Sequence, residues 1–209
     1  MWRVFLRLRS PDMKDTYACW SCETQRSLQQ LPVICPSCDK VQRIPPGASP
    51  YAILDIQPER FGVSFEDVEA KWLKRSRKCH PDRYAMRDAQ ERRYAVEQMA
   101  ATNDAFKVVS QVISRGAYFM AARGLPPDAM PDELFLMEMM EAQEAATSAG
   151  EDHQQMKKDF EKRFADDLKS LEQIFDHGAD NVEQAPLLLT RLRYFRRVLD
   201  ALDGRAPEI

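Results

Sequence analysis

The sequence has 209 residues, of which 44% are hydrophobic and 30% are charged, and its formal net charge is −3. This share of apolar side chains excludes an intrinsically disordered chain, and only 7 glycines argue against an all-β fold rich in tight turns. The acidic balance, with a sequence pI of about 5.7, argues against a protein that wraps nucleic acid, since such proteins carry basic domains.

The first segment, residues 1–16, opens with ten residues that include three arginines and no acid. This composition is typical of the start of a mitochondrial presequence, but a stretch this short before Asp12 makes a poor transit peptide. It also lacks the apolar core length of a secretory signal. We therefore expect a flexible N-terminus over residues 1–16.

Residues 17–44 carry two Cys-x-x-Cys pairs separated by 12 residues: Cys19, Cys22, Cys35 and Cys38. This spacing lets four thiolates converge on one tetrahedral ion, as in zinc ribbons. A segment this short buries too little apolar surface to fold without a further cross-link. A structural metal ion bound by the four cysteines would provide that cross-link. Zinc is favoured, although iron fits the same geometry, and two redox pairs or disulfides are the alternative.

Residues 45–50 have the composition of a linker, and a helical region follows to residue 124. Ser64 is a candidate N-cap for a first long helix, one face of which carries a basic row: Lys71, Lys74, Arg75 and Lys78. Its apolar face includes Cys79, which we expect to be a small buried hydrophobe. His80-Pro81-Asp82 ends this helix, because proline cannot continue the hydrogen-bond ladder. A second long helix, with an apolar stripe from Ala95 to Ile113, completes an antiparallel pair.

A break with three prolines, residues 124–131, opens the last region of the chain. Helical patterns follow over 132–147 and 151–176, and a final helix carries the apolar positions between Leu188 and Leu202. Pro186 is expected in the first turn of that helix, where proline is tolerated. The predicted fold is therefore mostly α, with a small four-cysteine zinc ribbon (17–44), a helical domain (45–124) and a C-terminal three-helix bundle (125–209).

The tripeptide His80-Pro81-Asp82, placed between two amphipathic helices of which the first has a basic face, resembles the J-domain. Pro50–Ile56 is similar to the first short helix of that family, and Ala101–Phe106 to the end of its third. The resemblance implies that residues 45–124 are a J-domain and that the tripeptide stimulates ATP hydrolysis by a DnaK-type chaperone. It also implies that the basic row docks on an acidic surface of that chaperone. The charge row alone would indicate only a solvated helix face.

Two further motifs, Phe135–Glu141 and Arg191–Phe195, resemble the HscB co-chaperones of iron–sulfur cluster assembly, some of which carry a four-cysteine module with a Cys-Trp-x-Cys pair. This resemblance implies a J-domain joined at an angle to a three-helix bundle that binds an IscU-type scaffold. By motif, the scaffold-binding residues are Leu136, Met140, Glu141, Glu144 and Tyr194. Simple core packing is an equal interpretation of Leu136 and Met140, because their helix is apolar on several faces.

Together the two resemblances imply a co-chaperone that stimulates an HscA-like, DnaK-type chaperone and delivers an IscU-type scaffold to it. The alternative is a J-domain co-chaperone with a different client, chosen by the metal ribbon. We expect no catalytic residues, because the three histidines lie in separate helical contexts, and no bound nucleotide, because the sequence has no glycine-rich phosphate loop.

Features that are absent from the sequence argue against membrane and nucleic-acid partners, and its cysteines indicate the cellular compartment. It has no run of about 18 apolar residues, so we expect no membrane span. Arg26 is the only basic residue between Cys19 and Cys38, which argues against a ribbon that binds nucleic acid. Thiols spaced for metal indicate a reducing compartment, for which we expect the cytoplasm, with the mitochondrial matrix as the alternative. A homodimer is also compatible with the sequence.

Overall fold

The computed structural model describes residues 16–148, 153–178 and 180–205, so nearly all of the expected flexible N-terminus lies outside the described residues. The chain divides into two compact units, the first ending at Tyr118 and the second beginning at Phe119. This division falls within helix α4 (Val112–Ala122), six residues before the domain boundary that we placed at the proline-rich break. Within the described ranges, no helix is both long and apolar enough to cross a membrane.

The first unit begins with a small cysteine-rich ribbon, which contains both strands found among the described residues. β1 (Thr16–Ala18) and β2 (Gln25–Ser27) pair antiparallel, with Tyr17 opposite Arg26. An isolated bridge joins Ile34 to Val41 farther along the ribbon. Short strands and tight turns leave little room for a core of its own, as the length of this segment predicted.

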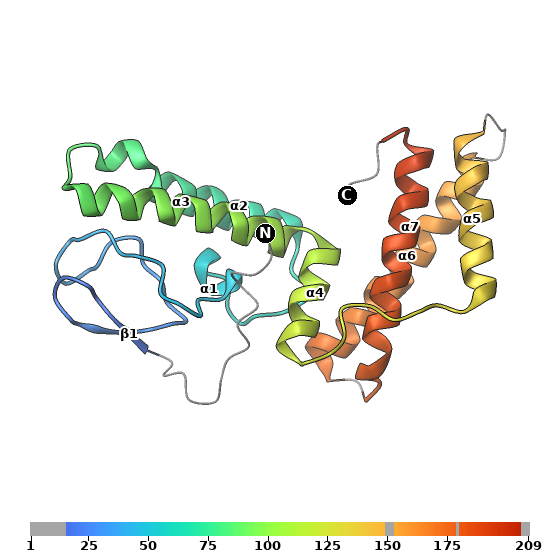
Figure 1. Cartoon of the computed structure of the whole chain (residues 1–209), viewed down its shortest axis with the longest axis horizontal. Helices are drawn as coiled ribbons and strands as arrows, with labels where there is room; N and C mark the ends of the chain where they lie inside the picture. Colours follow the sequence, from blue (N-terminus) through green and yellow to red (C-terminus); the bar gives the residue numbers. More distant parts are fainter. Residues whose placement is uncertain (1–15, 149–152, 179, 206–209) are drawn as a thin grey trace. The chain divides into compact units, whose positions relative to one another are not determined.

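Four helical segments follow the ribbon: α1 (Pro50–Leu54), α2 (Phe65–Cys79), the 3-10 helix η2 (Pro81–Tyr84) and α3 (Ala89–Ser110). Figure 1 shows α2 and α3 side by side as an antiparallel pair, with the ribbon running along them. The predicted cap is confirmed, because the Ser64 hydroxyl accepts a hydrogen bond from the backbone N–H of Asp67.

The second long helix ends earlier than its apolar stripe predicted. Gln111 is extended (φ −94°, ψ 122°) and separates α3 from α4, so Ile113 belongs to α4. Arg115 compensates for the break, because its guanidinium donates to the carbonyls of Val109 and Val63. Periodicity could not reveal this break, since the apolar spacing continues across it.

The ribbon and the helices share one hydrophobic core. Val33 and Val41 from the ribbon pack with the buried side chains of Cys79, Tyr84, Tyr94 and Ala95. Trp20 lies against this cluster, 5.6 Å from Tyr94 between ring centroids in an edge arrangement. The ribbon therefore folds as a part of the first unit, joined to α2, η2 and α3.

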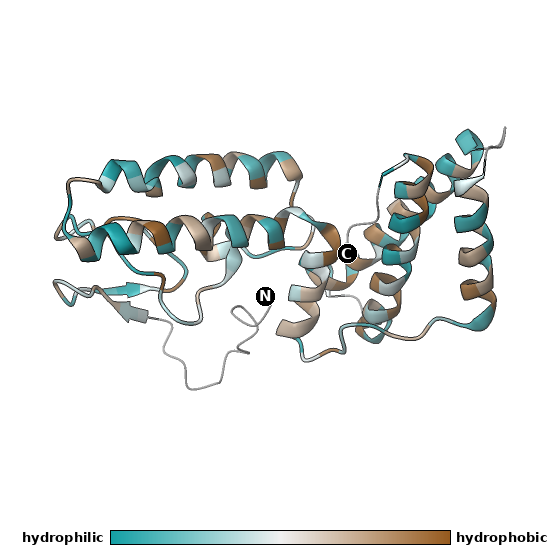
Figure 2. Ribbon diagram, turned by 45° about the horizontal axis from the view of Figure 1, so that its top comes forward, coloured by the Kyte–Doolittle hydropathy of each residue, from teal (hydrophilic) through white to brown (hydrophobic). Residues whose placement is uncertain are grey.

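The second unit contains α5 (Glu133–Thr147), α6 (His153–His177), the 3-10 helix η3 (Val182–Gln184) and α7 (Ala185–Leu202). Pro186 lies in the first turn of α7, as predicted. Figure 2 shows apolar bands along these helices between hydrophilic stretches. Their core includes Met139, Leu171, Leu192 and Phe195, each almost fully buried, so the mostly helical layout with a final three-helix unit is confirmed.

Candidate metal centre and chaperone-docking surface

The four ribbon cysteines converge on one point. Their Sγ atoms all lie within 4.8 Å of one another, with 3.7 Å between Cys19 and Cys38 and 3.8 Å between Cys22 and Cys35. Four sulfurs at about 2.3 Å from a tetrahedral zinc ion would lie about 3.8 Å apart. A disulfide needs about 2.05 Å, so the four free thiols form a metal-binding constellation rather than two disulfides.

Two equivalent turns of the backbone bring these thiols together. After each Cys-x-x-Cys pair the chain passes through a left-handed residue, Glu23 (φ 59°) or Asp39 (φ 56°). The N–H of each donates back to the carbonyl of the first cysteine of its pair, Cys19 at 3.0 Å and Cys35 at 2.9 Å. Each pair is thereby folded into a tight loop with both sulfurs on its inner side.

Arg26 lies next to the sulfur cluster. In the sequence it stood out only as the single basic residue between Cys19 and Cys38, and nothing there indicated that it contacts a cysteine. Its Nη2 donates to the Sγ of Cys35 at 3.3 Å and to the Oγ of Ser37 at 3.0 Å. Burial raises the pKa of Cys35, but hydrogen bonds from the backbone of Ser37 and Cys38 and from Arg26 outweigh it and lower this pKa to about 6. The thiolate that a metal requires is therefore favoured at Cys35, whereas burial raises the pKa of Cys38 to about 11.

A buried carboxylate joins the ribbon to α3. Glu91, of which 1% of the side chain is exposed, accepts hydrogen bonds from Lys40 Nζ at 2.9 Å and from the backbone N–H of Val41 at 3.2 Å. Arg87 adds an ion pair with Asp39 at 2.7 Å. None of these residues was a predicted site residue, because the pairing joins positions about 50 residues apart and no local pattern marks it.

Arg75 does not lie on the exposed basic row to which the sequence assigned it. Only 8% of the residue is exposed, and its guanidinium donates to the Leu31 carbonyl at 2.7 Å, Gln98 Oε1 at 2.6 Å and Thr102 Oγ1 at 3.2 Å. It is the one residue of the row that points between the helices and the ribbon. Arg75 therefore has a structural role, and we leave it out of the docking row.

The other three basic residues lie along the accessible side of α2. Lys74 and Lys78 are exposed, and Lys71 is half-buried, with its Nζ on the backbone carbonyl (2.6 Å) and the carboxylate (3.2 Å) of Asp55. They are spaced by three and four residues, so their charges add on one helix face. This face can attract an acidic partner.

His80-Pro81-Asp82 follows α2 directly and is accessible. The side chain of His80 is 48% exposed and its Nδ1 lies 3.5 Å from Asp82 Oδ2. Tyr84 anchors this loop, because its buried ring lies in the core and its hydroxyl donates to the Lys78 carbonyl at 2.6 Å. Cys79, one residue earlier, is fully buried and burial raises its pKa, which confirms it as a packed hydrophobe.

The predicted scaffold-binding residues lie on α5 and α7 of the second unit. Met140 is 67% exposed, and Glu141 and Glu144 are exposed, whereas Leu136 and Tyr194 are half-buried. Two apolar residues of α5 that the sequence did not single out are also exposed, Leu134 at 79% and Met137 at 52%. Simple core packing explains Met139, which is buried, but it does not explain Met140.

Comparisons with known proteins agree on one family. Residues 131–203 match the family model of the HSCB C-terminal oligomerisation domain. The iron–sulfur cluster co-chaperone protein HscB of Homo sapiens is 26% identical over 190 residues, which cover 86% of this chain and 78% of the human protein. The co-chaperone protein HscB homolog of Shewanella amazonensis is 31% identical over 154 residues, which cover 68% of this chain and 87% of that protein.

The fold agrees with these matches. The crystal structure of human co-chaperone protein HscB superposes with a TM-score of 0.74 at 23% identity, covering 90% of this chain and 98% of that one. Sequence matches over most of the relatives' length and a shared fold lead to the same assignment: the chain belongs to the HscB family of iron–sulfur cluster co-chaperones.

Proposed function

We propose that this protein stimulates ATP hydrolysis by a DnaK-type, HscA-like chaperone and delivers an IscU-type scaffold to it during iron–sulfur cluster assembly. The observation that carries the proposal is the exposed His80-Pro81-Asp82 loop at the end of a basic helix, in a chain of the HscB family. The alternative is that the ribbon selects a different client. In that case the second unit should be dispensable for client binding.

On the chaperone side, α2 and the loop have separate tasks. Lys71, Lys74 and Lys78 attract an acidic surface and orient the helix on it. The loop then contacts the chaperone at a fixed position, because Tyr84 ties it to the last turn of α2. Hydrolysis takes place in the chaperone, so this chain contributes binding and orientation only.

On the scaffold side, the exposed apolar face of α5 is the proposed contact. Met140, with Leu136 and Tyr194 partly accessible beside it, offers apolar area, and Glu141 and Glu144 provide a charged rim. Leu134 and Met137 extend the apolar area along the helix. Flexible methionine side chains adapt well to a partner surface, which suits a protein-binding face.

The metal that we propose for the ribbon is zinc in a structural role. Four thiolates, two of them buried, close the coordination sphere and leave no position for a substrate. Because four free thiols persist best where glutathione keeps them reduced, we also propose the cytoplasm, or the mitochondrial matrix, as the site of action.

The test of the function is single-turnover ATP hydrolysis by a DnaK-type chaperone, with the scaffold present or absent. We expect wild-type protein to accelerate hydrolysis and the scaffold to increase the effect, whereas His80→Gln should return the rate to that of the chaperone alone. His177→Gln, the same substitution at an exposed histidine of the second unit, should stimulate fully. No acceleration by wild-type protein would refute the proposal, and acceleration that ignores the scaffold would favour a different client.

A further inference from the structure

A cleft of about 550 Å³ separates the ribbon from the basic face of α2. Its ribbon wall runs from β2 through the following turn and includes Arg26, Gln30 and Leu31. Its helix wall is the basic row itself, Lys71, Lys74, Arg75 and Lys78, with Asp55 at one end. The three lysines of the proposed docking face therefore line a two-walled site, whereas His80-Pro81-Asp82 is not among its lining residues.

The charge of this cleft is strongly one-sided. Five of its lining residues are cationic and one, Asp55, is acidic, although the whole chain carries a net charge of −3. On the ribbon wall the charge of Arg26 is paired with the Cys35 sulfur, so the attraction for an anion comes mainly from the lysines of α2. Opposed walls of low dielectric constant strengthen the field between them, so these lysines attract an anionic segment more strongly in the cleft than on an open helix face.

The ribbon wall has a fixed position. Arg75, in the middle of the basic row, donates to the Leu31 carbonyl at 2.7 Å and so ties the ribbon turn to α2. Lys40 and the backbone of Val41 hold the other side of the ribbon on Glu91 of α3. Because both ends are tied down, a partner entering the cleft meets a preorganised wall rather than a loop that must first be ordered.

We propose that the ribbon completes the chaperone-docking site: an acidic segment of the DnaK-type chaperone inserts between the ribbon turn and α2 and contacts both walls. This inference rests on the proposed function, and it gives the ribbon a role in binding besides its structural one. Charge complementarity selects the occupant, since Lys74 and Lys78 are exposed at the cleft and have no acidic partner among the described residues.

Gln30 allows the ribbon wall to be tested without touching the metal centre. It is exposed, lines the cleft and is neutral, so one substitution can add either sign of charge. Gln30→Glu should raise the Kd for the chaperone about threefold at low ionic strength, and Gln30→Lys should lower it by about the same factor. A variant that folds poorly can only bind more weakly. A higher Kd for Gln30→Glu together with a lower Kd for Gln30→Lys would therefore show an effect of charge and not of stability.

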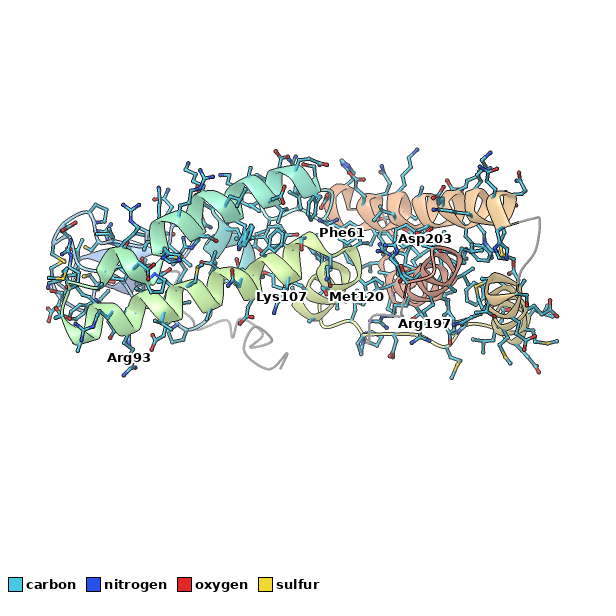
Figure 3. All side chains as sticks on the ribbon, turned by 90° about the horizontal axis from the view of Figure 1, so that it is seen from above. Phe61, Arg93, Lys107, Met120, Arg197 and Asp203 are labelled. Atoms are coloured by element: carbon cyan, nitrogen blue, oxygen red, sulfur yellow. The ribbon has the colours of Figure 1, made fainter. Side chains whose placement is uncertain are left out.

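The measurement is the Kd for the chaperone by titration, at low and at physiological ionic strength. Gln29→Glu is the matched control on the ribbon, because Gln29 is exposed but does not line the cleft, and it should have a smaller effect. Lys74→Glu should weaken binding about tenfold, whereas Lys107→Glu should not, because Lys107 projects from α3 on the side away from α2 (Figure 3).

The possible failures are distinguishable. If wild-type protein does not stimulate the chaperone, the proposed function fails. If it does, and Lys74→Glu weakens binding while both Gln30 variants keep the wild-type Kd, the ribbon is no part of the docking site and this inference fails alone. A Gln30 effect on the affinity for the scaffold instead of the chaperone would also overturn it.

Discussion

Removal of the metal that we propose for the ribbon should destabilise the helices of the first unit as well as the ribbon. Val33 and Val41 of the ribbon pack with Tyr84, Tyr94 and Cys79 of the helices in one core. If the ribbon unfolds, its valines and the helix side chains that they cover are both exposed to water. A fully buried valine contributes about 1.5–3 kcal/mol, and two are lost here. We expect the free energy of unfolding of the first unit to fall by about 3 kcal/mol or more.

Tryptophan fluorescence can follow this change in urea, because Trp2, Trp20 and Trp72 all precede the division after Tyr118. Protein treated with a chelator should unfold at lower urea, and added zinc should restore the original midpoint. The released metal should be zinc, whereas strong visible absorption by the untreated protein would identify iron. An unchanged midpoint after complete metal removal would show that the ribbon does not support the helices.

Two neighbouring basic residues of α2 should differ sharply in how much their substitution lowers stability. Arg75→Met removes three hydrogen bonds of a buried guanidinium and leaves Leu31, Gln98 and Thr102 without this donor, so we expect a loss of about 3 kcal/mol of stability. Lys74→Met changes an exposed side chain and should alter stability by less than about 0.5 kcal/mol.

The two variants form a matched pair, because both replace a long cation by methionine at adjacent positions of one helix. Urea unfolding followed by tryptophan fluorescence measures both. Equal losses of stability would contradict the separate roles of the two residues. A stable Arg75→Met variant would mean that its hydrogen bonds to the ribbon and α3 contribute nothing net.

Local signals predicted the elements of this fold well. The cap at Ser64, the proline in the first turn of α7 and the end of α2 before His80-Pro81-Asp82 each depend on a few adjacent residues. The cysteine spacing likewise predicted the sulfur cluster, because tetrahedral coordination restricts where two Cys-x-x-Cys loops can meet.

Long-range contacts were not predictable in the same way. The basic row was assigned as a unit from its helical spacing, but spacing cannot show that Arg75 turns toward the ribbon while Lys74 faces solvent. The burial of Glu91 under Lys40 depends on where the ribbon packs, and no periodicity encodes that position. The exposure of Met140 beside the buried Met139 also required the packing of the second unit.

Delivery of the scaffold to the chaperone is the central claim, and it is tested most directly by recovering the chaperone after ATP hydrolysis and quantifying the scaffold bound to it. With wild-type protein we expect the scaffold to be retained on the chaperone. His80→Gln should abolish retention because hydrolysis is not stimulated, and Met140→Lys should reduce it because the apolar face of α5 no longer binds the scaffold. Equal retention without this protein, or with either variant, would contradict the account.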